Sequence, residues 1–164
     1  MSGVLVRPAR DDELALVGEL TAQAYLDGGI AGSGDGYVEQ LRDAARRQRE
    51  AELLVAVDGS LLGTVTICAP GSALAELARP GELEFRMLAV AVDARGRGVG
   101  EVLVRAVAER ALREQRTAVV LCTVRDNPAA QRLYARLGFV RDPARDWRPV
   151  PEVDLLAFRL DLPR

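Results

Sequence analysis

Apolar and polar residues follow two different spacings along the chain, which predicts a mixture of helices and strands. Apolar residues that recur every three or four positions are typical of amphipathic helices, and short apolar runs between Gly, Pro or Asp are typical of strands. This pattern predicts helices at 11–26, 37–50, 99–115 and 128–137. It predicts strands at 3–8, 52–57, 61–68, 82–92, 117–124, 139–142 and 153–161.

Turn and cap residues mark several of these boundaries. Asp58 and Gly59 separate two apolar runs, which is typical of a β-hairpin. Asn127 and Pro128 are expected to begin a helix as its N-cap and first residue, and Gly138 is expected to end it. Loops are expected where Gly and Pro gather, at 27–36, 70–81 and 93–100.

The order of the expected elements indicates the fold class. They follow one another as β-α-α-β-β-β-α-β-α-β-β, and the run at 117–124 is apolar throughout, as in a central strand covered on both faces. The sequence has no internal repeat, no low-complexity tract and no linker that would divide it. We therefore expect a single α/β domain over residues 1–164, with three layers and a mixed β-sheet between helices.

Three features of the composition limit the kinds of catalysis and metal site that the chain can have. The 164 residues include no His, all 22 basic residues are Arg, and the two Cys, Cys68 and Cys122, lie far apart inside apolar runs. Without His, Ser-His-Asp and Cys-His catalysis and most zinc sites are excluded; without Lys, so are Schiff-base chemistry and the P-loop lysine. Both Cys are expected to be buried, inert thiols. Acid and base roles therefore fall to Asp, Glu, Tyr, water or backbone groups.

Charge and hydropathy limit the partners. The net charge of −2 gives no argument for a nucleic-acid partner. No apolar run approaches the roughly 20 residues of a membrane-spanning helix, so no membrane partner is expected. The first residues lack the basic and then apolar segments of a signal peptide, and the expected location is cytoplasmic.

The segment at 90–101 carries the most informative motif. Three glycines stand at alternate positions between an expected strand and an expected helix, where backbone N–H groups and a helix N-terminus form an anion site. A Walker loop is excluded because the chain has no Lys, and a dinucleotide fingerprint is disfavoured because Glu101 and Leu103 stand where Gly or Ala is required. The pattern Arg/Gln-x-x-Gly-x-Gly/Ala remains, and residues 95–100 match it completely.

In this pattern the chain resembles the GNAT-superfamily N-acetyltransferases, whose acyl-CoA pyrophosphate loop has the same form. The resemblance includes the strand at 84–90 and residues 127–139, where Asn-Pro-x-Ala-x-x-Leu-Tyr-x-x-x-Gly-Phe is similar to the family's second cofactor segment. The order of elements matches over nearly the whole chain. Family members often carry Asp-Pro after the strand, where this chain has Ala91 and Val92. The resemblance implies a GNAT-like domain with a splayed central sheet.

The resemblance also implies acetyl-CoA as the acetyl donor, with no metal. Val90, Val92 and Asn127 would line the pantetheine arm, which the strand end can bind much as an added strand would be bound. The backbone N–H of Leu88 would face the thioester carbonyl as an oxyanion donor. The pyrophosphate would lie on the loop residues Arg95, Gly96, Arg97, Gly98, Val99 and Gly100.

Tyr134 is the candidate general acid. It lies seven residues after Asn127, about two helical turns, so both side chains project from the same face of the helix. A phenol there can give its proton to the leaving thiolate. The alternative is a tyrosine that belongs only to the core or to an interface.

Glu84 is the candidate general base for the acceptor amine. Strand alternation places it on the same side as Arg86, Leu88 and Val90, and its spacing from Val90 suits the family. The alternative is a strand-end carboxylate that pairs with Arg86. Glu82 is a second candidate for the base.

Three aromatic side chains are candidates for binding the acceptor. Trp147, in the loop between the last two expected strands, would wall one side of the acceptor pocket, and the alternative is packing of that loop. Tyr25 and Tyr37, which flank the loop at 27–36, would form the opposite wall.

The implied activity is direct transfer of an acetyl group from acetyl-CoA to a primary amine in a ternary complex. No acetyl-enzyme is expected, because neither Cys has a His or Lys beside it to activate the thiol. The acceptor partner would be a small-molecule amine or a peptide. Acetylation of protein N-termini or lysines, a non-catalytic acyl-CoA-binding sensor, and a homodimer all stay open.

Overall fold

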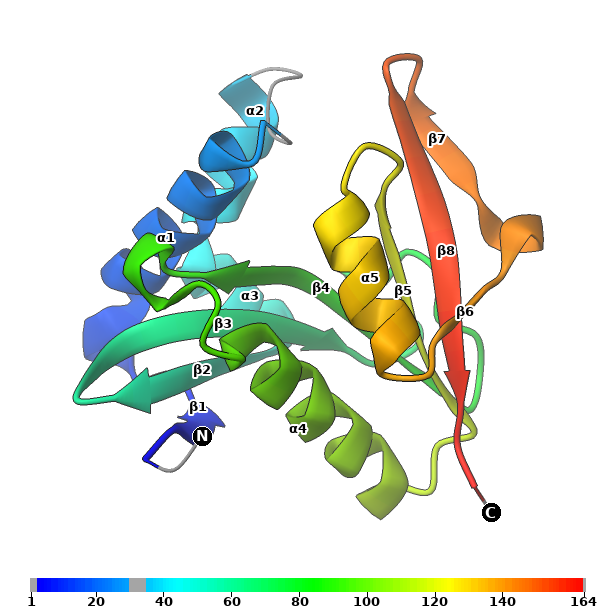
Figure 1. The fold of residues 1–164 in the computed structure, drawn as a ribbon, viewed down its shortest axis with the longest axis horizontal. Coiled ribbons are helices and arrows are strands. Elements are labelled where there is room, and N and C mark those ends of the chain that lie inside the picture. The colour runs from blue at the N-terminus through cyan, green and yellow to red at the C-terminus, as the bar shows by residue number, and fades with distance from the viewer. Residues whose placement is uncertain (1–2, 30–34, 164) are drawn as a thin grey trace.

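Eight strands of the described residues, 3–29 and 35–163 of the computed structural model, form one open sheet with helices on both faces (Figure 1). The order across the sheet is β1-β2-β3-β4-β5-β8-β6, and β7 pairs with β8. The strands are β1 Leu5–Pro8, β2 Glu52–Asp58, β3 Ser60–Cys68, β4 Glu82–Val90, β5 Ala118–Val124, β6 Val140–Arg141, β7 Trp147–Val150 and β8 Val153–Asp161. Residues 30–34 of the expected loop at 27–36 lie outside the described residues.

The helices lie in two layers around this sheet. Those of one layer are α1 Leu14–Asp27, α2 Asp35–Arg42 and α3 Ala44–Glu50, and those of the other are α4 Val99–Arg113 and α5 Pro128–Arg136. α4 and α5 share one apolar core with the sheet, whereas α1, α2 and α3 pack in two further clusters against β2 and β4. This arrangement confirms the three-layer α/β fold with a mixed sheet. None of the described helices is long and apolar enough to cross a membrane.

The helix expected at 37–50 is two helices that separate at Asp43. The Asp43 carboxylate accepts a hydrogen bond from the Arg46 N–H at 3.0 Å and begins α3 as its N-cap. A short acidic side chain that bonds to the nearby backbone in this way competes with continuation of a helix. The buried Arg47 guanidinium then donates to the Leu41 carbonyl oxygen at 2.8 Å, which satisfies the end of α2.

A β-bulge in β4 reverses the alternation expected for that strand. Opposite a single residue of β3, β4 has two residues, Met87 and Leu88, and Met87 has a φ of 56°. The extra residue shifts the two-residue side-chain pattern by one position. Leu88 therefore packs into the same core cluster as Phe85. The expectation that Glu84 shares a face with Leu88 and Val90 is wrong for this reason.

β4 and β5 pair only at their first residues and then separate. Their parallel pairs are Glu82 with Ala118, Leu83 with Val119 and Glu84 with Val120. Beyond them β4 continues along β3 and β5 continues along β8, so the two strands diverge (Figure 1). The splayed central sheet that the resemblance implied is present.

α5 has the caps that the sequence predicts. The Asn127 Oδ1 accepts a hydrogen bond from the Ala130 N–H at 3.2 Å. At the other end Gly138 has a φ of 96°, and the Phe139 N–H donates to the Tyr134 carbonyl oxygen at 3.0 Å, as in a Schellman motif. These caps fix both ends of the helix that carries Tyr134.

Candidate active site

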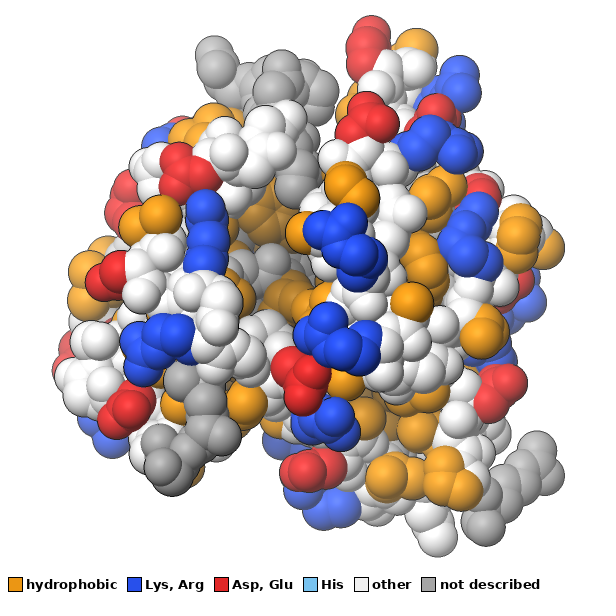
Figure 2. All heavy atoms as spheres, in the orientation of Figure 1, with side chains coloured by type: hydrophobic (Ala, Val, Ile, Leu, Met, Phe, Trp, Pro, Cys, Tyr) orange, Lys and Arg blue, Asp and Glu red, His pale blue; other side chains and the backbone are white. Residues whose placement is uncertain are grey.

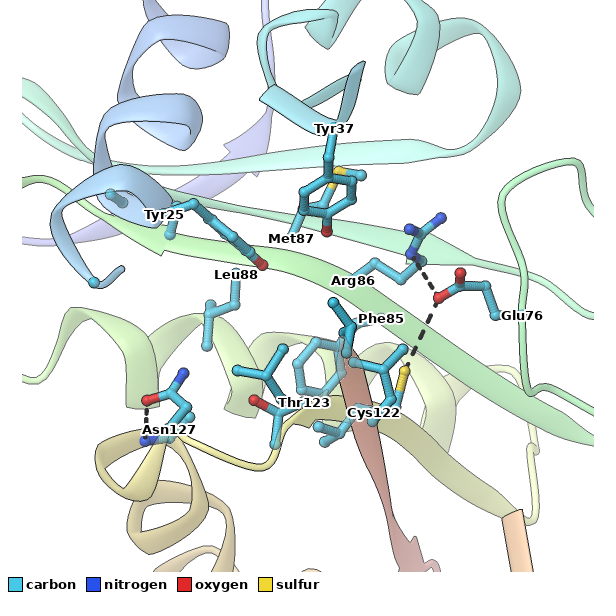
Figure 3. A pocket seen from close by; sticks show the side chains of 18 of the residues that line it. Tyr25, Tyr37, Glu76, Phe85, Arg86, Met87, Leu88, Cys122, Thr123 and Asn127 are labelled. Atoms are coloured by element: carbon cyan, nitrogen blue, oxygen red, sulfur yellow. Dashed lines mark hydrogen bonds and ion pairs between the residues drawn. The ribbon is translucent and has the colours of Figure 1, made fainter. Parts of the chain in front are cut away.

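A cavity of about 860 Å³ lies where β4 and β5 separate. Figure 2 shows a hollow with orange, hydrophobic side chains inside it, between the α1–α2 side of the molecule and the α5–β8 side. The walls come from α1, α2, β4, β5, α5, the β7–β8 hairpin and the loop at 70–81. Figure 3 shows the side chains that project into this space.

The expected anion-binding loop lies at the N-terminus of α4. Gly96 and Gly98 have φ values of 78° and 80°, a backbone conformation in which other residues are strained. A Cβ atom at either position would meet nothing within 4 Å, so the space beside the loop is open to a ligand. Arg95 and Arg97 are exposed and add positive charge to the helix N-terminus, which favours an anion there.

The expected cofactor-binding residues differ in how they reach the cavity. The side chain of Val92 is on the surface, with 66% of it exposed, and Val99 is buried in the core. Of residues 96–100, Arg97 can therefore offer a side chain to a ligand, and the others can offer only backbone groups. Those that line the cavity are Val90, Arg95 and Asn127.

The edge of β4 that faces β5 has no strand partner beyond Glu84 within the described part of the sheet. Backbone groups on such an edge can bind an extended ligand as they would bind another strand. Leu88, directly after the bulge at Met87, lines the cavity there, on the side of β4 that faces Asn127 (Figure 3). The structure thus places the Leu88 backbone beside the cavity, beyond the point where β4 and β5 separate.

Tyr134 lines the cavity from α5 and is also part of an aromatic cluster. Only 5% of it is exposed, and its ring centroid lies 5.9 Å from Phe85, 5.8 Å from Phe139 and 5.9 Å from Phe158. Burial raises the pKa of the Tyr134 hydroxyl above its ordinary value, and the nearby Cys122 thiol adds to that effect. The hydroxyl therefore keeps its proton over the usual working range of pH.

Glu84 does not line the cavity. It is completely buried, and its carboxylate accepts hydrogen bonds from three consecutive backbone N–H groups of the loop at 70–81. The Glu84 Oε1 lies 2.9 Å from the N atom of Glu76, 2.8 Å from that of Leu77 and 3.0 Å from that of Ala78. With its oxygens occupied in this way, Glu84 anchors the loop to β4.

Replacement of Glu84 by Gln is expected to lower the free energy of unfolding by about 1–3 kcal/mol, because an amide presents an N–H group to backbone donors that the carboxylate had satisfied. Urea denaturation measures the change. Glu39→Gln, at a carboxylate on α2 that is 70% exposed, is the matched control and should change stability little. A Glu84→Gln protein of normal stability with a changed pH–rate profile would contradict the anchoring role.

Glu76 is the carboxylate that does face the cavity, and the sequence analysis missed it. Its side chain is 25% exposed, and its Oε1 lies 3.2 Å from the Arg86 Nε and 3.9 Å from the Cys122 Sγ (Figure 3). Burial raises the pKa of the Glu76 carboxyl above its ordinary value, although Arg86 opposes the shift. Glu76 is the only acidic residue of the loop at 70–81, which is the one signal that could have identified it.

Glu82, the second candidate for the base, lies in an ion-pair network away from the cavity. Its carboxylate accepts hydrogen bonds from Arg145 at 2.6 Å, from Arg159, and from the Arg79 N–H at 2.8 Å. Burial by itself would raise the pKa of Glu82, but these donors lower it to about 2. A carboxylate held in this way is a weak proton acceptor. The network therefore stabilises the sheet and does not supply a base to the cavity.

Of the three aromatic residues expected to line the acceptor pocket, two line the cavity. Tyr25 and Tyr37 both line it, with ring centroids 6.3 Å apart in an edge-on arrangement. Trp147 is not among the described lining residues. It lies in β7, a strand that the sequence analysis did not predict, because Pro interrupts its pattern and is tolerated only at a sheet edge. The hairpin reaches the cavity through Val150 and Val153 instead.

The two Cys have different surroundings. Cys68 is buried, as expected, but Cys122 is half-buried and lines the cavity. Burial, with a contribution from Glu76, raises the pKa of the Cys122 thiol to about 12. The thiol is therefore neutral near neutral pH, and its expected inertness has an electrostatic cause.

Comparisons with known proteins agree with this architecture. Residues 17–139 match the sequence profile of the Acetyltransferase (GNAT) family. No curated protein sequence is significantly similar to the chain.

Solved structures of the same fold cover nearly the whole chain. A GCN5-related N-acetyltransferase from Kribbella flavida is 25% identical, with a TM-score of 0.71 and coverage of 98% of both chains. The structure of yncA from Salmonella typhimurium with its cofactor acetyl-CoA is 21% identical, with a TM-score of 0.70 and coverage of 99% of this chain and 96% of that one. A GNAT-family acetyltransferase from Staphylococcus aureus Mu50 is 13% identical, with a TM-score of 0.77 and coverage of 98% and 99%. Because the profile match covers most of the chain, this protein belongs to the acetyltransferase (GNAT) family.

Proposed function

We propose that this protein transfers an acetyl group from acetyl-CoA to a primary amine, directly and within a ternary complex. One observation carries the proposal: the glycine loop of α4 and the open edge of β4 lead into a cavity that contains the carboxylate of Glu76 and the phenol of Tyr134. An anion site, a site for an extended arm and an acid–base pair are the parts that this reaction needs. Family membership, and the presence of acetyl-CoA in the related yncA structure, support acetyl-CoA as the donor.

The residues around the cavity fit acetyl-CoA. The backbone N–H groups of residues 96–100, with Arg95 and Arg97, would hold the pyrophosphate at the open side of the loop. The unpaired edge of β4 near Val90, opposite Asn127, would hold the pantetheine arm. When bound, acetyl-CoA supplies the thioester from which the acetyl group is transferred.

Glu76 takes the role of general base that the sequence analysis gave to Glu84. An alkylammonium group has a pKa of about 10 and must lose a proton before its nitrogen can attack. The raised pKa of Glu76 makes it a better proton acceptor than an ordinary carboxylate, and Arg86 holds it in place at 3.2 Å. Glu84 contributes indirectly, because it fixes the Glu76 backbone.

The Leu88 N–H acts on the carbonyl oxygen of the thioester, and the Tyr134 hydroxyl acts on its sulfur. Leu88 follows the bulge, where its N–H can donate to the carbonyl oxygen. Tyr134 gives its proton to the leaving sulfur. A buried phenol is a weak acid, but a sulfur anion in the same surroundings is a strong base, as the pKa of about 12 of the neighbouring Cys122 thiol indicates. That same pKa argues against Cys122 as a nucleophile, since little thiolate forms near neutral pH.

A thiol-release assay with acetyl-CoA and a set of primary amines tests the proposed function. The expected result is release of CoA that depends on the amine, with the acetylated amine identified by mass spectrometry. The set includes peptides with a free N-terminus or a lysine, so that a protein acceptor would be detected. Binding of acetyl-CoA without amine-dependent release for any acceptor would instead indicate an acyl-CoA sensor.

Gly98→Glu is expected to weaken CoA binding by about tenfold or more, because a side chain is strained at a φ of 80° and its negative charge would stand at the helix N-terminus. Isothermal titration calorimetry with CoA measures the loss. Gly59→Glu is a matched control, since Gly59 has a φ of 75° and equally open space but lies in the β2–β3 turn. It should lose stability to a similar degree and keep its CoA affinity; equal affinity losses in the two variants would contradict the assignment of the loop.

A further inference from the structure

The cavity has two halves of different character. The half beside α4 and α5 is the proposed donor half. The other half, which we name the acceptor half, lies between α1–α2, the loop at 70–81 and the β7–β8 hairpin. Its side chains include Tyr25, Tyr37, Glu76, Arg86, Met87 and Cys122 (Figure 3), and Val153 of the hairpin also lines the cavity.

The charged groups of the acceptor half neutralise each other. Of the lining residues that the structure describes, Glu76 alone is acidic, and its Oε1 lies 3.2 Å from the Arg86 Nε. Arg86 also donates to the Leu74 carbonyl oxygen at 3.0 Å. A ligand thus meets one carboxylate with no excess of negative charge, and one guanidinium that already has two acceptors. A second ammonium on the acceptor would lose water without gaining a carboxylate partner among the described lining residues, and a carboxylate on the acceptor would compete with Glu76 for the Arg86 guanidinium.

The remaining surface of the acceptor half is uncharged and partly aromatic. Tyr25 and Tyr37 pack edge-on against each other and form an apolar cluster with Met87 (Figure 3). Burial raises the pKa of both tyrosine hydroxyls, so this wall stays neutral. Aromatic faces and a methionine side chain pack well against aromatic or branched apolar groups.

We propose that the acceptor is a primary amine with a single positive charge and an aromatic or branched apolar body, rather than a polyamine or an amino acid. The ammonium lies at Glu76 and the apolar body lies against Tyr25, Tyr37 and Met87. This inference rests on the proposed function, because it identifies the acceptor class for the same site.

Matched amines test the charge requirement. Pentylamine and cadaverine differ only in the second ammonium group, and phenylethylamine and phenylalanine differ only in the carboxylate. We expect kcat/KM in the thiol-release assay to be about tenfold or more higher for pentylamine than for cadaverine, since the second ammonium would be buried without a carboxylate partner. We expect the same difference for phenylethylamine over phenylalanine, since the carboxylate would compete with Glu76 for Arg86. Phenylethylamine should be the best of the four acceptors.

A substitution on the wall should change this preference. Val153→Glu adds a second carboxylate to the wall of the cavity at a half-buried position in β8. It is expected to raise the kcat/KM ratio of cadaverine to pentylamine by about tenfold, through a charge-assisted hydrogen bond to the second ammonium. Glutamine has nearly the same shape as glutamate without its charge, so Val153→Gln should not raise the ratio.

Calorimetry with CoA-bound protein separates this inference from the proposed function. Tighter binding of phenylethylamine than of cadaverine or phenylalanine supports the acceptor class even if no acetyl group is transferred, a result that would overturn only the proposed function. Equal or better use of cadaverine or phenylalanine overturns the acceptor class while acetyl transfer stands. Absence of binding and of transfer for all four amines overturns the acceptor class as well.

Discussion

The Glu76→Gln protein is expected to lose roughly 10²-fold in kcat/KM near neutral pH, in the range of general-base effects. Glutamine keeps the size of the side chain and can still accept a hydrogen bond from Arg86, but it cannot take a proton from the acceptor. The variant must therefore wait for an amine that arrives neutral. Its kcat/KM should rise as the pH approaches the pKa of the amine, about 10, and the deficit should shrink there.

The wild-type protein should lose activity at low pH for a different reason, the protonation of Glu76. Burial raises the pKa of Glu76, so its carboxylate begins to take up a proton at a higher pH than an ordinary glutamate. Activity should fall as the pH drops through that range, and the inflection caused by this protonation should be absent from Glu76→Gln, whose kcat/KM follows the fraction of neutral amine. The charged or titratable groups around Glu76 are Arg86 of β4, Cys122 of β5, Tyr37 of α2, Cys68 of β3 and the buried Glu84.

Glu84→Gln is the control that distinguishes the two carboxylates. It should lose stability but keep the shape of the wild-type pH–rate profile, because its carboxylate is engaged by the loop backbone. Pre-steady-state and steady-state rates at several pH values supply both profiles. A Glu76→Gln profile parallel to that of the wild type would remove Glu76 from the mechanism and favour a water chain as the base.

The Tyr134→Phe protein is expected to lose roughly 10²-fold or more in kcat with little change in CoA affinity. Phenylalanine keeps the ring, so its packing against Phe85, Phe139 and Phe158 should survive. Only the proton donor is removed, and the leaving sulfur must then depart as an anion in surroundings that raise the pKa of a thiol to about 12.

Three measurements on Tyr134→Phe separate catalysis from folding. Urea denaturation should give a stability close to that of the wild type, and calorimetry should give the same CoA affinity. The steady-state rate with the best acceptor supplies kcat. Wild-type kcat in a stable variant would show that Tyr134 serves the aromatic cluster alone.

The local signals of the sequence were sufficient for most of the elements and for the glycine loop. Asn127, Gly138 and Gly98 each act within a few residues of themselves: one caps a helix by its own side chain, and the other two adopt left-handed backbone conformations. The residues that determine these features all lie within a short stretch of the chain. The glycine loop, the helix that carries Tyr134 and the α/β class could therefore be predicted without the structure.

The residue that we propose as the base could not be predicted in this way. Alternation in β4 pointed to Glu84, but the bulge at Met87 shifts the pattern, and the bulge depends on pairing with a distant strand. The loop at 70–81 then folds over Glu84, and three of its backbone N–H groups donate hydrogen bonds to the carboxylate. That contact turns Glu84 into an anchor and leaves Glu76 facing the cavity.

The positions of the turns, the helix caps and the glycine loop thus follow from the sequence alone, because glycine, asparagine and proline act on their immediate neighbours. Three features depend on the folded structure: which carboxylate faces the cavity, the absence of Trp147 from its described lining, and the ion pair of Glu76 with Arg86. Each of these depends on strand register and on loops that meet from distant parts of the chain. Burial then sets the proton affinity of a side chain, and burial is a property of the folded molecule.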